Sequence, residues 1–147
     1  MPFDLKNLNP STKFMYSENG EETGEYICLR LASDADNKRF FNSIGVKEKV
    51  EQIYNPKTRQ MDRQTYFHTN EDQREQFNEI VWDFSITDWK LFSTEKDEDD
   101  NYIEIPCTKE NKIKFMRESP LFATWTADCL ETLREQLSTH AKAVRKN

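Results

Sequence analysis

The segment TNEDQREQFNEIVWDF, residues 69–84, carries the clearest structural signal in the chain. Its apolar residues recur at the i, i+3, i+4, i+7 spacing that forms one stripe of an α-helix. These residues are Phe77, Ile80, Val81 and Phe84. Thr69 or Asn70 can cap the N-terminus, and the acidic residues that follow suit the positive end of the helix dipole. The segment therefore predicts an amphipathic helix with one face in a core.

Upstream of this helix, the sequence predicts two hairpins and a short helix. The predicted strand pairs are 12–17 with 25–32, and the weaker 48–54 with 63–68. In the first pair, apolar and polar residues alternate around Ile27, which is the periodicity of a strand with one buried face. Ser33 is placed to cap the helix, and Gly45 can end it in the left-handed conformation. Residues 1–11 are expected to be irregular.

Downstream, the sequence predicts an exposed acidic loop at 93–101 and two more helices. Thr108 is expected to cap the first helix. Ser119 followed by Pro120 marks the start of the second, because proline is favoured at the first helical position. The apolar side of this last helix comprises Phe122, Trp125, Cys129, Leu133 and Leu137. Its basic end, residues 140–147, is predicted to fray.

These elements define an α+β fold. One or two β-hairpins in the N-terminal half pack on three to four α-helices, and the C-terminal half is mainly helical. The length of 147 residues fits a single domain spanning 1–147. Apolar content is modest but rich in aromatic residues, which bury a large area each, so a small core is feasible.

The charge distribution argues against a nucleic-acid ligand. The chain carries a net charge of −6, and residues 71–104 hold twelve acidic against three basic side chains. A phosphate backbone requires a basic face. No apolar run is long enough for a membrane span, and the three cysteines are widely spaced without a C-x-x-C pair. We therefore expect a cytoplasmic protein with reduced thiols that pack as small apolar groups.

No residue pattern predicts catalysis, a metal or a cofactor. Asp97, Asp99 and Asn101 match the start of an EF-hand loop, but Tyr102 stands where that loop needs glycine and Thr108 where it needs glutamate. The two histidines, at positions 68 and 140, are far apart in sequence, and the three glycines form no phosphate-binding loop. The sequence predicts a non-enzymatic protein that works by binding another protein.

Tryptophans are the candidate partner-binding residues, because exposed aromatics favour protein contacts. Trp82 lies off the apolar stripe of its helix, Trp89 adjoins the acidic loop, and Trp125 lies in the last helix. The alternative for Trp82 and Trp89 is that a small core wraps around them.

Several of these segments together resemble small phage and prophage tail proteins. The shared pattern is a D-W unit, an acidic turn, an I-P-x-T-x-E-N helix start and a closing helix. Here it reads Trp82-Asp83-Phe84, Ile86-Thr87-Asp88-Trp89, Ile105-Pro106-Cys107-Thr108-Lys109-Glu110-Asn111-Lys112 and a helix through Leu133. The hairpin ending Ile27-Cys28-Leu29-Arg30-Leu31 is similar to the N-terminal strands of the tail assembly chaperones among them.

This resemblance implies a non-enzymatic chaperone of virion morphogenesis. Such proteins coat the long, helical tape-measure protein of a bacteriophage or prophage and help tail tube subunits gather on it. An acidic body with apolar grooves between helices suits an amphipathic partner helix. Two alternatives remain open. One is a minor structural protein of the tail or connector, and the other is an acidic inhibitor that occupies the nucleic-acid groove of a host protein.

Overall fold

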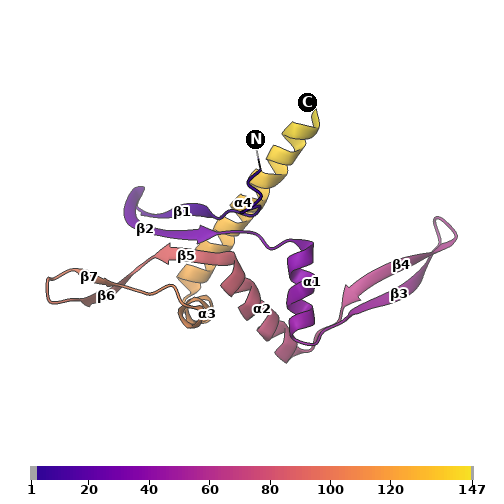
Figure 1. Ribbon diagram of the computed structural model, residues 1–147, viewed down its shortest axis with the longest axis horizontal. Helices are drawn as coiled ribbons and strands as arrows, with labels where there is room; N and C mark the ends of the chain where they lie inside the picture. The colour runs from indigo at the N-terminus through magenta and orange to yellow at the C-terminus, as the bar shows by residue number, and fades with distance from the viewer. Residues whose placement is uncertain (1–2, 147) are drawn as a thin grey trace. The chain divides into compact units, whose positions relative to one another are not determined.

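A computed structural model describes residues 3–146 of the chain, with side chains as far as Lys142. The elements, in chain order, are β1 (Thr12–Glu18), β2 (Glu21–Leu29), α1 (Asp34–Ser43), β3 (Glu48–Asn55), β4 (Gln60–Phe67), α2 (Glu71–Ser85), β5 (Ile86–Lys90), β6 (Phe92–Lys96), β7 (Tyr102–Glu104), α3 (Lys109–Glu118) and α4 (Pro120–Lys146) (Figure 1). The α+β class is therefore confirmed, with both predicted hairpins in the N-terminal half.

Contacts between residues divide the chain into two compact units. The first unit comprises the residues up to Leu31 and those from Trp82 onward, and the second unit is Ala32–Val81. The helix α2 crosses the boundary, so its last turn belongs to the first unit. The sequence predicts one domain. No glycine-rich or proline-rich linker in the sequence marks the boundaries between the two units.

The first unit is built on an antiparallel sheet in the order β1-β2-β5. The central strand β2 contributes Ile27 and Leu29, both fully buried, and β5 contributes Ile86 and Trp89. No pattern in the sequence predicts the strand β5, which follows α2 directly. Pairing of Ile27 with Trp89 in the observed register brings both side chains to the same face, where α4 packs.

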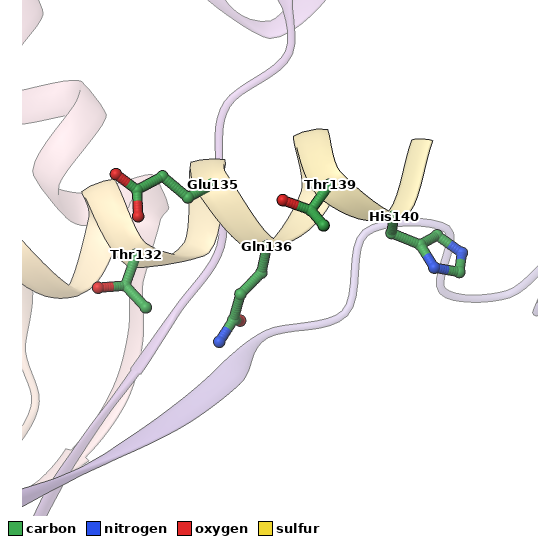
Figure 2. Close-up of a pocket in the computed structure, with 5 residues that line it drawn as sticks. All are labelled: Thr132, Glu135, Gln136, Thr139 and His140. Atoms are coloured by element: carbon green, nitrogen blue, oxygen red, sulfur yellow. The ribbon is translucent and has the colours of Figure 1, made fainter. Parts of the chain in front are cut away.

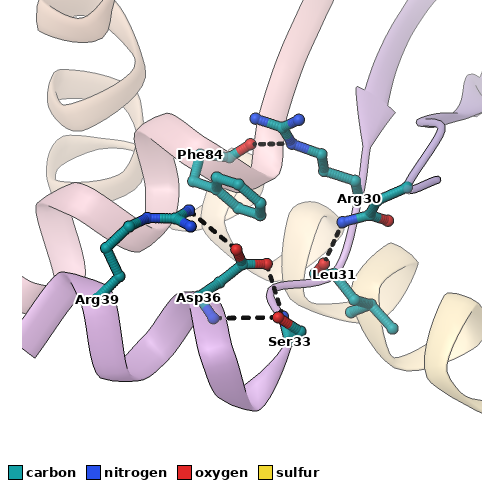
Figure 3. A network of polar contacts seen from close by, with 7 residues as sticks. Arg30, Leu31, Ser33, Asp36, Arg39 and Phe84 are labelled. Atoms are coloured by element: carbon teal, nitrogen blue, oxygen red, sulfur yellow. Dashed lines mark hydrogen bonds and ion pairs between the residues drawn. The ribbon is translucent and has the colours of Figure 1, made fainter. Parts of the chain in front are cut away.

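The C-terminal end of α2 is held by two basic side chains from elsewhere in the first unit. Arg30 donates from Nε to the carbonyl oxygen of Phe84 (2.9 Å), and its guanidinium lies 3.8 Å from the centre of the Phe84 ring (Figure 3). Lys112, from α3, donates from Nζ to the carbonyl oxygen of Asp83 at 3.1 Å. Carbonyls in the last turn of a helix lack intrahelical donors, so cations stabilise them. No residue of that turn is itself basic.

The second unit joins α1, the β3–β4 hairpin and the beginning of α2. Ser33 caps α1 as predicted, in a reciprocal capping box with Asp36 (Figure 3). Phe41 stacks on Phe77 at 4.0 Å and on Phe67 at 4.5 Å between ring centroids. These three rings come from α1, β4 and α2, so Phe41 lies on the packing face of α1.

Two segments differ from the sequence prediction. Residues 93–96, expected in the acidic loop 93–101, form most of β6, which pairs with β7 and leaves only residues 97–101 as the turn. The ammonium of Lys96 lies 5.0 Å from the centre of the Tyr102 ring, which helps to hold this pair. The basic end of α4, predicted to fray from His140, continues as helix to Lys146; Asn147 lies outside the described residues.

Candidate functional site

A groove of about 390 Å³ in the first unit is the best candidate for a binding site. It lies where the sheet, the β6 strand and the helices α3 and α4 meet. The described lining comprises Tyr16, Glu18, Glu25, Leu91, Phe92, Thr94, Ile105, Phe115, Ser119, Leu121, Phe122 and Trp125. Two of these side chains are carboxylates and none is basic. The volume falls within the range of about 300 to 1,000 Å³ that is usual for ligand pockets.

The wall of the groove is a continuous set of aromatic contacts. Phe115 packs edge-on against Phe122 at 5.4 Å between centroids, and Phe122 packs against Trp125 at 6.1 Å. Tyr16, from β1, meets the edge of Trp125 at 5.0 Å. Aromatic pairs in these geometries add stability beyond the area that they bury. The wall is therefore preformed, and it leaves Leu121 at the rim with 67% of its surface exposed.

Carboxylates mark the edge of the groove near the β1–β2 hairpin. Glu25 accepts a hydrogen bond from the backbone N–H of Phe92 at 3.0 Å, which fixes its side chain. Removal from solvent, and then the nearby negative charges of Glu18 and Glu25, raise the pKa of the Tyr16 hydroxyl. Tyr16 is therefore a neutral hydrogen-bonding group at physiological pH. The site presents apolar surface, a phenol and negative charge, so its complement is an apolar segment that also carries a cation.

The three predicted tryptophans have different roles. Trp125 lines the groove and is half-buried. Trp89 is only 5% exposed; its indole N–H donates to the carbonyl oxygen of Ile105 at 2.8 Å, so it is a core residue. Trp82 is half-buried at the end of α2, where the guanidinium of Arg117 lies 5.6 Å from its ring centre. The groove therefore includes one of the three, and the alternative considered for Trp89, that the core wraps around it, describes its position.

Most residues of the groove carry no signal in the sequence. Tyr16 and Glu25 come from the first hairpin, and Phe115 and Leu121 from two helices. No spacing in the sequence relates residues so far apart, because strand register and helix packing bring them together. The one local signal was the apolar stripe of α4, which contained Phe122 and Trp125.

No three His, Cys, Asp or Glu side chains among the described residues gather in a way that could hold a metal ion. Burial raises the pKa of all three thiols, that of Cys129 to about 11. A second hollow lies along α4, where one face of that single helix supplies the side chains shown in Figure 2. These are Thr132, Glu135, Gln136, Thr139 and His140.

The acidic turn between β6 and β7 is organised by the side-chain carboxylate of Asp97. Asp97 accepts hydrogen bonds from the backbone N–H groups of Asp99 (2.9 Å) and Asn101 (3.0 Å). Asp100, which has a positive φ of 61°, forms an ion pair with Lys96 at 3.5 Å. The carboxylate that would begin a calcium loop is thus used to close a turn. Of the acidic segment 71–104, residues 71–81 belong to the second unit and the rest to the first.

Comparisons with protein-family models, curated proteins and solved structures found no match to the chain. Within the described residues, no helix combines the length and apolarity that crossing a lipid bilayer requires.

Proposed function

We propose that this protein is a non-enzymatic tail assembly chaperone of a bacteriophage or prophage. Its partner is the tape-measure protein, which it holds in the host cytoplasm while tail tube subunits assemble. The observation that carries the proposal is the aromatic groove of the first unit, with its acidic edge and its exposed Leu121. A long helical partner can place the apolar residues of one face in such a groove, at i, i+3, i+4 spacing.

The residues of the phage-tail pattern support the proposal because they build the frame around this groove. The Trp89 indole is fixed to Ile105, and Thr108 caps α3 by accepting from the backbone N–H of Asn111 at 3.2 Å. The amide of Asn111 in turn donates to the carbonyl oxygen of Pro106 at 2.9 Å. These contacts fix the positions of α3 and the start of α4. The residues of the pattern therefore also fix the wall of the groove.

The test is co-expression with the tape-measure protein of the same phage or prophage, followed by affinity capture of the tagged chaperone. Wild-type chain is expected to keep the tape-measure protein soluble and to retain it on the column. Leu121→Asp places a carboxylate at the groove, which the bound partner would cover. Because burying an unpaired carboxylate is costly, this variant is expected to reduce capture at least about tenfold. Leu137→Asp is the matched control, because Leu137 is exposed on the same helix but does not line the groove.

Different negative results would contradict different parts of the proposal. Wild-type chain that neither captures nor solubilises the tape-measure protein refutes the chaperone function. Equal capture by Leu121→Asp and Leu137→Asp places the contact outside the groove. Mass spectrometry of purified particles separates the alternative: a chaperone is absent from them, whereas a minor tail or connector protein is present.

A further inference from the structure

The β3–β4 hairpin of the second unit is a long ribbon with little cover. Its two strands pair residue by residue from Glu48–Phe67 to Asn55–Gln60. Five apolar side chains of the ribbon are exposed to solvent: Val50 (51%), Ile53 (40%), Tyr54 (57%), Met61 (55%) and Tyr66 (41%). Among the described residues the sheet contains only these two strands, so each has an outer edge without a neighbouring strand. A ribbon of two strands is marginally stable in water and gains from a third.

The register assigns the side chains of the ribbon to two faces. Directly opposed residues share a face, so Val50, Tyr54 and Met61 lie on the same one. This face is continuous with Phe67, which stacks on Phe41 at the base of the ribbon. The opposite face carries the charged Lys49 and Glu51, together with Ile53 and Tyr66.

The outer edge of β3 is complementary to itself. When two copies of Glu48-Lys49-Val50-Glu51-Gln52 run antiparallel about Val50, each Lys49 stands opposite a Glu51 of the other copy. The arrangement is symmetric, so it contains two such Lys49–Glu51 pairs, and no two like charges stand opposite each other. We propose that β3 is a dimerisation edge, at which a second copy of the chain adds its own β3 to form a four-stranded sheet in the order β4-β3-β3-β4.

The backbone and the apolar face favour this arrangement over other strand pairings. Unpaired N–H and C=O groups along an edge are satisfied by another strand. An exposed lysine on such an edge normally discourages pairing, and here Glu51 of the second copy neutralises it. Pairing Val50 with Val50 puts the two faces that carry Val50, Tyr54 and Met61 on the same side of the new sheet. The other possible edge is β4, which could pair with its own copy so that Asp62 stands opposite Arg63. In that register each residue is opposed by a neighbour from the other face of the ribbon. The corresponding faces of the two copies would then lie on opposite sides of the sheet.

The test is sedimentation equilibrium of the full-length chain in reducing buffer at about 0.15 M salt, where exposed charges still interact over roughly 8 Å. Wild type is expected to show a monomer–dimer equilibrium. Lys49→Glu or Glu51→Lys alone turns two attractive contacts into repulsive ones, and each is expected to weaken dimerisation at least about tenfold. The double variant with both substitutions restores opposite charges at both contacts and is expected to return to within about threefold of wild type.

Arg63→Glu is the matched control, because it makes the same charge change as Lys49→Glu on the neighbouring strand and should leave dimerisation unchanged. A strictly monomeric wild type overturns the proposal. So do single reversals that behave like Arg63→Glu, which would indicate a different edge or a register centred elsewhere. Hydrogen exchange gives a second readout that needs no variant: rising concentration should slow amides at the outer edge of β3 and not those at the outer edge of β4. Binding of the tape-measure protein enters none of these measurements, so this inference and the chaperone function fail separately.

Discussion

The ammonium of Lys112 lies 3.1 Å from a carboxylate oxygen of Asp83 and 3.1 Å from the backbone carbonyl oxygen of the same residue. The lysine side chain is 9% exposed and the aspartate 39%. Asp83 lies in the last turn of α2, and Lys112 lies in the first turn of α3. One cation thus neutralises a partly buried acid and also satisfies the end of α2, which ties α3 to α2 within the first unit.

Replacing Lys112 with methionine is expected to destabilise the protein by about 1 to 3 kcal/mol. The methionine keeps an apolar stem in place but leaves the Asp83 carbonyl without its donor. The cost stays below that of a fully buried pair because water still reaches the Asp83 carboxylate. Urea denaturation measures the change, and Lys114→Met, an exposed lysine on the same helix, is the control. Equal midpoints for the two variants would contradict this role for Lys112.

Replacing Trp89 with phenylalanine is expected to cost about 1 to 3 kcal/mol. The variant retains an aromatic ring against Phe115 and Phe122 but removes the N–H donor to Ile105 and leaves unfilled volume. Thermal unfolding followed by circular dichroism measures the loss. Trp82→Phe should change stability less, since Trp82 is only half-buried. A larger loss for Trp82→Phe would contradict the assignment of Trp89 as the central core aromatic.

Local signals in the sequence predicted the helices and the first hairpin well. Ser33, Asn70 and Thr108 all cap helices through their side chains, as their positions indicated. Such contacts span three residues, so the sequence displays both partners together. The apolar stripe of α4 likewise placed Phe122, Cys129 and Leu133 in the core, although Leu137 is 53% exposed because the helix extends beyond its packing partners.

Non-local pairing explains what the sequence did not reveal. The strand β5 follows α2 with no glycine or proline between them, and it is a strand because β2 offers it an edge. The groove is equally non-local, since Tyr16 and Trp125 are joined only through the packing of β1 against α4. Tertiary context of this kind overrides local propensity, and a single sequence does not encode it in any short spacing.

The Cys129 thiol is expected to react with iodoacetamide very slowly in the folded protein. Burial raises its pKa from 9.0 to about 11, and only the thiolate reacts. At pH 8 the thiolate fraction falls from roughly 10⁻¹ to roughly 10⁻³, so labelling should be at least about tenfold slower than in urea. Because the folded pKa is the higher one, the thiol favours folding below pH 9 and this contribution is lost as pH rises toward 11. Mass spectrometry of labelled peptides measures the rates, and equal rates with and without urea would refute the prediction.

Thr126 offers the one substitution that should stabilise the protein. Its side chain is 1% exposed, and among the described residues its hydroxyl has no hydrogen-bond partner. A buried hydroxyl without a partner costs free energy, whereas valine has nearly the same shape and no polar atom. We expect Thr126→Val to add about 1 kcal/mol and to raise the melting temperature by about 2 to 4 °C.

Thr132→Val on the same helix is the control for that substitution. Thr132 is exposed, and its hydroxyl donates to the carbonyl oxygen of Asp128 at 3.0 Å, so its replacement should leave the melting temperature nearly unchanged. Differential scanning calorimetry of both variants decides the matter. A lower melting temperature for Thr126→Val would mean that the hydroxyl is satisfied in solution, most simply by a buried water. The interior of the sheet–helix interface would then be polar at that point and not a dry core.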